Sequence, residues 1–138
     1  MGRILAIDFG TKRVGLAVTD PLKIVASPLD TVHSRDLVKY LKDYDASEGI
    51  EEIVLGLPTK LDGSDTTITK QVRQLHKHLK KQFPEKPVNL HDERFTSKMA
   101  LDAMIAGGMK KKDRREKGNI DKVSAAVILR SYLESRGI

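Results

Sequence analysis

The stretch ILAIDFGTKRVGLAVTD, residues 4–20, decides the fold of this chain. Its first apolar run is of the kind found in a strand that is buried on both faces. A second apolar run follows after a glycine-containing turn, so the pattern predicts a β-hairpin over residues 3–8 and 14–19. Gly10 and Gly15 are expected to permit positive φ in the turn and to let a ligand approach the backbone closely.

Asp8 ends the first predicted strand. An unpaired charge in such a position costs several kcal/mol of folding free energy, so we expect the carboxylate to face a cation. Lys12 and Arg13 follow in the turn, within reach of an anion that approaches Asp8. The opening hairpin therefore predicts a site for a cation and an anion together.

The rest of the chain alternates between strand and helix patterns. A third, irregular strand is predicted over residues 24–32, with a break at Pro28. Further strands are predicted over residues 53–57 and 88–93, helices over 35–47 (ended by Gly49), 68–83, 96–105 and 120–134, and a loop over 107–118. This order predicts an α/β fold with a mixed sheet, antiparallel at its start and parallel later, flanked by helices.

The composition limits the classes of function. A chain of 138 residues has room for one core, so we expect a single domain over residues 1–138. It contains no Cys, which excludes a disulfide framework and a thiolate zinc site. No apolar run is long enough to cross a bilayer and no signal peptide is recognisable, so we expect a cytoplasmic protein without membrane contact. The net charge of +6 favours a polyanionic partner.

Acidic residues stand at the ends of three predicted elements. Asp92 and Glu93 end the last strand as Asp8 ends the first, and the carboxyl ends of parallel strands border the ligand crevice of such sheets. If these strands are neighbours, side-chain alternation lets only one of Asp92 and Glu93 face the crevice with Asp8, and we favour Glu93. Asp121 lies in the first turn of the last helix, after Asn119. The helix dipole is by itself a sufficient reason for an acidic residue there.

Four motifs carry a resemblance to a known family. In chain order they are IDFGTKRVGLA from residue 7, VLGLP from residue 54 with DG at 62–63, DERFTS from residue 92 with Ala100, and ID at 120–121 with Ala125, Ala126 and Leu129. Together they closely resemble the YqgF/RuvX family over nearly the whole chain. The resemblance implies an RNase-H-like fold and a nuclease, either a Holliday junction resolvase or an enzyme that matures the 5′ end of pre-16S ribosomal RNA.

The resemblance also implies an acidic triad of Asp8, Glu93 and Asp121, with Asp92 as a helper. Hydrolysis of a phosphodiester needs an activated water, a neutralised phosphate and a stabilised leaving oxygen, which two divalent ions roughly 4 Å apart supply. Carboxylates without Cys or a paired His motif favour Mg²⁺ or Mn²⁺ over zinc. We therefore expect these four carboxylates to bind two such ions.

Basic residues near the carboxylates are expected to bind the phosphates of the substrate. The resemblance puts Lys12 and Arg94 near the substrate, and Lys60 follows a predicted strand at the border of the crevice. Residues 107–118 hold six basic and two acidic residues directly before Asp121. Phosphate contacts are expected from Arg13 and from Lys110, Lys111, Lys112, Arg114 and Arg115. The predicted partner is structured RNA or branched DNA, free or within a ribosome or pre-ribosomal particle.

Other interpretations stay open at this level. DFGTK at residues 8–12 also resembles the first phosphate loop of actin, heat-shock chaperone ATPases and sugar kinases, although these need two facing domains and this chain has room for one. A non-catalytic RNA-binding factor of ribosome assembly would keep the same fold and charge. The chain is a monomer or a homodimer, and symmetric cleavage of a junction would need two active sites. His76 and His78 are expected on an exposed helix face, solvated rather than bound to metal.

Overall fold

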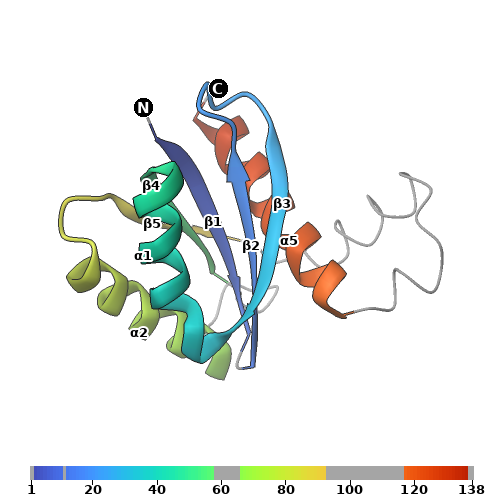
Figure 1. Ribbon diagram of the computed structural model, residues 1–138. Coiled ribbons are helices and arrows are strands. Elements are labelled where there is room, and N and C mark those ends of the chain that lie inside the picture. The colour runs from blue at the N-terminus through green and yellow to red at the C-terminus, as the bar shows by residue number, and fades with distance from the viewer. Residues whose placement is uncertain (1, 11, 58–65, 93–116, 137–138) are drawn as a thin grey trace.

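Five strands form one mixed sheet in the order β3-β2-β1-β4-β5 (Figure 1). The computed structural model describes residues 2–10, 12–57, 66–92 and 117–136, without the side chains of residues 117–121. The strands are β1 (Arg3–Phe9), β2 (Arg13–Thr19), β3 (Ala26–His33), β4 (Ile50–Leu57) and β5 (Val88–Asp92). β2 pairs antiparallel with β1 and β3, whereas β4 pairs parallel with β1 and β5. The predicted mixed sheet, with a hairpin first and parallel strands later, is confirmed.

The turn between β1 and β2 depends on Gly10 for space. The Gly10 N–H donates to the Arg13 carbonyl at 2.9 Å, and a Cβ at Gly10 would lie only 2.6 Å from that oxygen. The expected positive φ at Gly10 and Gly15 is wrong, because Gly49 is the only glycine of the described residues with a positive φ, at 83°. Gly15 lies inside β2, directly opposite Asp8.

β3 is continuous across Pro28, where a break was predicted. Its pairing with β2 shifts between Asp30, which faces Leu16, and Pro28, which faces Ala17. The sheet accommodates the proline because β3 is an edge strand, where a missing N–H removes no ladder bond toward a further strand. The predicted irregularity is therefore a change of register rather than the end of the strand.

Two helices cover one face of the sheet (Figure 1). α1 (Leu37–Glu48) follows a short 3₁₀ helix, η1 (Ser34–Asp36), and ends at the predicted Gly49, whose N–H donates to Asp45 O at 3.0 Å. α2 (Thr67–Gln82) begins with a reciprocal capping box between Thr66 and Thr69. The core under these helices includes the β1 side chains Leu5 and Ile7 and the helix side chains Leu37, Leu41, Val72 and Leu79.

α5 (Lys117–Ser135) covers the opposite face. Its Ala125, Ile128 and Leu129 pack on Ile4, Ala6, Ala17 and Val54. Successive strand residues point to opposite faces, so β1 contributes alternately to the two cores. This explains the continuous apolar run before Asp8.

Some predicted elements fall outside the described residues. These are the predicted helix over residues 96–105 and the loop over residues 107–116. The last two residues of the predicted loop, 117 and 118, belong to α5, so the expected loop boundary is wrong there. None of the helices in the described part of the chain is long and apolar enough to cross a membrane.

Candidate functional site

Asp8 lies at the carboxyl end of the central strand, on the face that α5 covers. Ile4 and Ala6 pack under α5, whereas Leu5 and Ile7 pack under α1 and α2. Alternation along β1 therefore places the half-buried Asp8 on the α5 face. The carboxyl ends of β4 and β5 meet this same edge, because both strands run parallel to β1.

A row of residues crosses the α5 face at the level of Asp8. Asp8 pairs with Gly15 on one side, and on the other it is level with Gly56, the residue after Leu55. Gly56 in turn pairs with His91. The strands that end in Asp8 and Asp92, considered above as possible neighbours, are therefore not adjacent, since β4 lies between them. Two glycines leave the backbone on both sides of Asp8 without side chains.

His91 is the next side chain of this row beyond Gly56. Its Nε2 lies 2.9 Å from Ser131 Oγ, and its ring meets the Tyr132 ring edge-on with centroids 5.7 Å apart. Burial lowers the pKa of His91, against the opposing charge of Asp92. His91 thus connects β5 to α5 at the level of Asp8.

The direction of α5 brings its first turns to the Asp8 end of the sheet. Near its other end, Tyr132 donates to Glu52, which lies opposite Ile4 in the sheet. Along α5, Asp121 is about 16 Å from Tyr132 at 1.5 Å per residue. Along β1, Asp8 is about 13 Å from Ile4 at about 3.3 Å per residue. Figure 1 shows that α5 begins toward the end of the sheet where β1 ends and runs toward the end where β1 begins, so its first turns, which include the backbone of Asp121, lie toward the Asp8 end.

The register also assigns a face to Asp92. Val88 and Leu90 belong to the core under α1 and α2, whereas Asn89 and His91 contact α5. Asp92 has the parity of Leu90, so its position lies on the face opposite to that of Asp8. Glu93, the next residue, lies outside the described residues.

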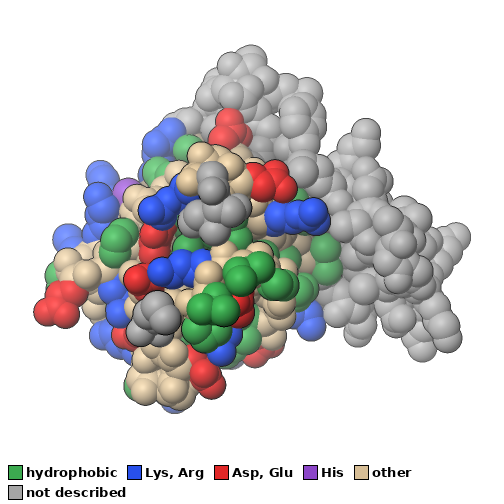
Figure 2. Space-filling view, turned by 90° about the horizontal axis from the view of Figure 1, so that it is seen from above, with side chains coloured by type: hydrophobic (Ala, Val, Ile, Leu, Met, Phe, Trp, Pro, Cys, Tyr) green, Lys and Arg blue, Asp and Glu red, His purple; other side chains and the backbone are tan. Residues whose placement is uncertain are grey.

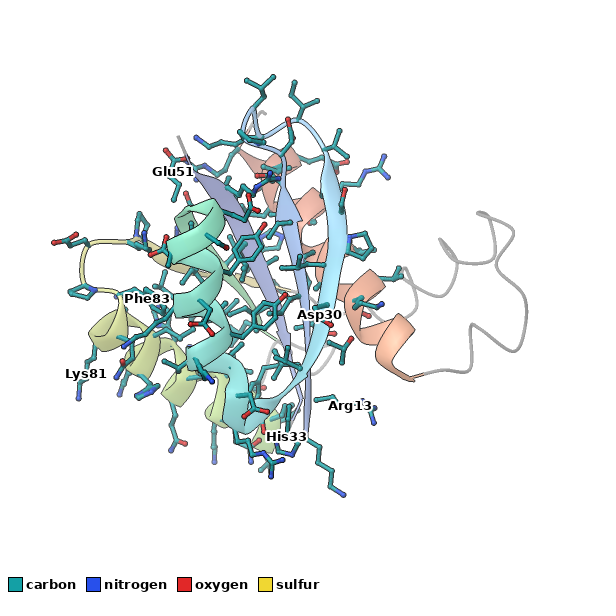
Figure 3. All side chains as sticks on the ribbon, viewed as in Figure 1. Arg13, Asp30, His33, Glu51, Lys81 and Phe83 are labelled. Atoms are coloured by element: carbon teal, nitrogen blue, oxygen red, sulfur yellow. The ribbon has the colours of Figure 1, made fainter. Side chains whose placement is uncertain are left out.

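Of the basic residues predicted to bind phosphate, the structure describes only Lys12 and Arg13. Lys12 and Arg13 are exposed at the hairpin turn, at the Asp8 end, where Arg13 pairs with His33 (Figure 3). The Lys12 carbonyl accepts from the Ser34 N–H at 3.0 Å, which ties the turn to η1. The other predicted phosphate ligands lie outside the described residues: Lys60, Arg94, Lys110, Lys111, Lys112, Arg114 and Arg115. Within the described ranges, no three acidic or His residues gather in a cluster able to hold a metal ion.

Two polar residues outside the Asp8 row have structural roles. The Asp20 carboxylate accepts the N–H groups of Ile24 and Val25, each at 2.8 Å, and these bonds lower its pKa. Asp20 follows β2 and so lies at the other end of the sheet from Asp8. His76 is half-buried, with Nε2 at 2.6 Å from the Val88 carbonyl, so the expectation that it is solvated is wrong.

A buried polar cluster under the end of α5 was not predicted from sequence. Glu52 is only 8% exposed and accepts hydrogen bonds from Tyr132 Oη, from Asn89 Nδ2 at 3.1 Å and from Arg136 at 2.7 Å. Burial raises the pKa of Glu52, but these three partners outweigh it and hold the pKa below its ordinary value. One feature of the sequence could have indicated this cluster. Glu52 is a charged residue two positions before Val54 in an apolar strand, so its side chain points to the same buried face as that of Val54.

Comparison with known proteins identifies the family. The family model RuvX, described as Holliday junction resolvase, matches residues 2–135. The chain belongs to the RuvX family. A relative from Amoebophilus asiaticus, named "Putative pre-16S rRNA nuclease", is 50% identical over 135 residues, which cover 98% of this chain and 96% of the relative. One from Christiangramia forsetii with the same name is 47% identical over 133 residues, 96% of this chain and 98% of the relative.

Solved structures confirm the RNase-H-like fold of this RuvX-family chain. Fowlpox virus resolvase with Holliday junction DNA has a TM-score of 0.61 at 14% identity, covering 97% of this chain and 98% of that one. Thermus thermophilus RuvC with its junction substrate has a TM-score of 0.58 at 17% identity, covering 99% and 97%. Family membership makes this RuvX chain a nuclease, a hydrolase of phosphodiester bonds.

Proposed function

We propose that this RuvX-family nuclease cleaves structured nucleic acid at the sheet edge marked by Asp8, with Asp8, Glu93 and Asp121 as catalytic residues. The observation that carries the proposal is the place of Asp8. It lies at the carboxyl end of the central parallel strand, on the face over which α5 begins. A single domain over residues 1–138 is consistent with one sheet whose two faces are both covered by helices.

The donor chemistry at this edge fits hard divalent cations. Asp8 offers carboxylate oxygens and the chain has no Cys, so Mg²⁺ or Mn²⁺ suits the site better than zinc. Asp8, Glu93 and Asp121 would hold two ions, with Asp92 as an accessory ligand. When bound, the ions would neutralise the scissile phosphate, activate water and stabilise the leaving oxygen.

The chain itself supplies position and charge. Pairing of β1 with β2 and β4 fixes the backbone that leads into Asp8, and the residues level with Asp8 on those two strands are the glycines Gly15 and Gly56. The first turns of α5 bring the positive end of the helix dipole toward this edge. Lys12 and Arg13, and the predicted contacts Lys60, Arg94 and residues 110–115, would bind phosphates that flank the scissile bond.

The 5′ end of pre-16S rRNA is the substrate that we propose first, because the relatives that match nearly the whole chain bear that name. Cleavage would then take place in the cytoplasm, on free precursor RNA or on a pre-ribosomal particle. Four-way junction DNA is the second candidate, because the matching family is described as Holliday junction resolvase.

The test is incubation of the purified protein with labelled pre-16S rRNA and labelled junction DNA, in Mg²⁺, Mn²⁺ or EDTA. We expect cleavage of the RNA with either metal and none in EDTA. Binding of RNA without cleavage in any metal would support the non-catalytic assembly factor instead. Hydrolysis of ATP under the same conditions would support the actin-like interpretation.

A further inference from the structure

An apolar surface stands at the end of the molecule opposite Asp8. Leu22, Ile24 and Val25 are 67%, 69% and 55% exposed, and in the described part of the chain they are the only large hydrophobic side chains so exposed. All three lie in the turn between β2 and β3. Figure 2 looks down on this end and shows hydrophobic side chains gathered beside charged ones. Ordered apolar side chains in one exposed group are typical of an interaction site.

The turn holds these side chains outward in a fixed conformation. The Asp20 carboxylate accepts from the backbone of Leu22 at 3.3 Å and from Ile24 and Val25 at 2.8 Å each. Lys23 has a positive φ of 61° and pairs with Glu51. Because the turn is already ordered, little conformational entropy is left to lose when a partner binds.

A groove runs from this turn to the last turns of α5. It has a volume of about 320 Å³ and is lined by Ile24, Val25, Ala26, Arg130, Leu133 and Glu134. Arg130 and Glu134 lie one helical turn apart, with Arg130 Nε 3.6 Å from Glu134 Oε1, and their side chains are 80% and 71% exposed. The groove is therefore lined both by apolar side chains and by one positive and one negative group, which lie on the same helix.

We propose that this surface binds a second copy of the chain, with the two α5 helices antiparallel about a twofold axis. In an isologous contact, residue i of one copy meets residue j of the other, and j meets i. An antiparallel pair of α5 helices brings Arg130 of each copy to Glu134 of the other. The Ile24 and Val25 side chains of each copy then enter the groove of its partner. The surface can therefore pair with a copy of itself, because each charge meets the opposite charge and the exposed apolar side chains meet the partner's groove.

This dimer has a consequence for the activity and, in this respect, rests on the proposed function. The surface lies at the end of the sheet opposite Asp8, so the dimer carries its two active sites at its outer ends. They cannot reach the two strands of one junction together. The dimer would therefore cut each phosphodiester independently, as suits processing of a single RNA end.

The test is the oligomeric state of the full chain, measured by sedimentation over a range of concentrations at low salt. We expect a monomer–dimer equilibrium whose dissociation constant rises about tenfold or more in Ile24→Asp, as for a central interface residue. Arg130→Glu and Glu134→Arg should each weaken the dimer, and the double reversal should restore it. Lys77→Glu, exposed on α2 at the other face, is the matched charge control. Thermal melting confirms that each variant is folded.

The outcomes separate this inference from the proposed function. A monomer at every concentration would overturn the dimer, and a dimer insensitive to Ile24→Asp, or not restored by the double reversal, would overturn its location. Cleavage per chain should be equal in the wild type and in the Ile24→Asp monomer. If neither protein cleaves nucleic acid while the dimer responds as expected, the proposed function fails and the dimer stands.

Discussion

Two carboxylates lie on the same face of the sheet, one near each end of α5, and their surroundings differ. Glu52, under the last turns of α5, is 8% exposed and bonded to Tyr132, Asn89 and Arg136. Asp8, toward the first turns, is half-buried and has a glycine beside it on each neighbouring strand. Large side chains surround the Glu52 carboxylate, whereas the residues level with Asp8 on the two neighbouring strands are glycines.

We infer that the carboxylate under the last turns of α5 contributes to stability, whereas the carboxylate toward its first turns contributes to activity. At the Glu52 end, Arg136 lies 5.4 Å from the centroid of the Tyr132 ring and also bonds the carboxylate, so the charge is balanced within the chain. A cation there also suits the negative end of the helix dipole. At the Asp8 end, the proposed balance comes from bound divalent ions. A variant at Asp8 should therefore lose cleavage and keep its stability, whereas a variant at Glu52 should lose stability and keep its cleavage rate.

Asp8→Asn gives the largest expected effect. It removes a proposed metal ligand without changing the side-chain volume, so cleavage should fall below about one hundredth of the wild-type rate, beyond the loss typical of an outer-sphere partner. Binding of nucleic acid should persist, and the metal-free protein should melt at the same or a higher temperature. Single-turnover cleavage, filter binding and thermal melting give the three quantities. Wild-type turnover by this variant would remove Asp8 from the metal site.

Glu93→Gln and Asp92→Asn come next and test the register at the end of β5. The position of Asp92 lies on the face away from Asp8, so Asp92→Asn should lose less activity than Glu93→Gln. Cleavage rates at saturating Mn²⁺ decide between them. The reverse order would mean that Asp92, not Glu93, acts with Asp8.

Glu52→Gln should show the opposite pattern to Asp8→Asn. It removes the charge that Arg136 and Tyr132 contact, so the free energy of unfolding should fall by about 1–3 kcal/mol, nearer the lower value because Arg136 is half-exposed. Cleavage per folded molecule should change little. Urea unfolding measures the loss, with Glu134→Gln as the control because its ion pair is exposed on the same helix.

The same comparison has a pH dependence. The pKa of Glu52 is lowered in the folded state, so its contribution to stability is present above its ordinary value of 4.5 and is lost as the pH falls through the folded pKa. The stability difference between wild type and Glu52→Gln should therefore be full at neutral pH and shrink in acid. An equal difference at both pH values would show that the Glu52 carboxylate does not contribute through its charge.

The smallest expected effect is on substrate binding at the Asp8 end. Replacement of Lys110, Lys111 and Lys112 by Gln should lower the slope of log K against log salt by about 0.7 to 0.9 for each phosphate that these side chains neutralise. Affinity for different sequences should fall alike, and cleavage of bound substrate should change less. Binding isotherms over a range of KCl give the slope. An unchanged slope would move the phosphate-binding role to Lys12, Arg13, Lys60 and Arg94.

Much of the fold follows from local sequence. The apolar runs of β1 and β2 and the helical stripe of residues 68–83 predict their elements, and Gly49 ends α1 as predicted. The end of a strand can also be predicted from local sequence, and for this reason the sequence alone places Asp8 at the carboxyl end of a strand. These features depend on neighbours within a few residues, and so the chain itself encodes them.

Only the tertiary structure decided which distant residues meet. The insertion of β4 between β1 and β5 put Gly56 and His91 in the row of Asp8, and the direction of α5 put Tyr132 and Arg136 over Glu52. These contacts cannot be predicted from the spacing of residues along the chain. Strand order and helix direction depend on how the whole sheet buries its two faces. For the same reason the exposure of the apolar side chains in residues 20–25 could not be predicted from sequence. No local feature of this turn shows that these side chains lie outside both hydrophobic cores.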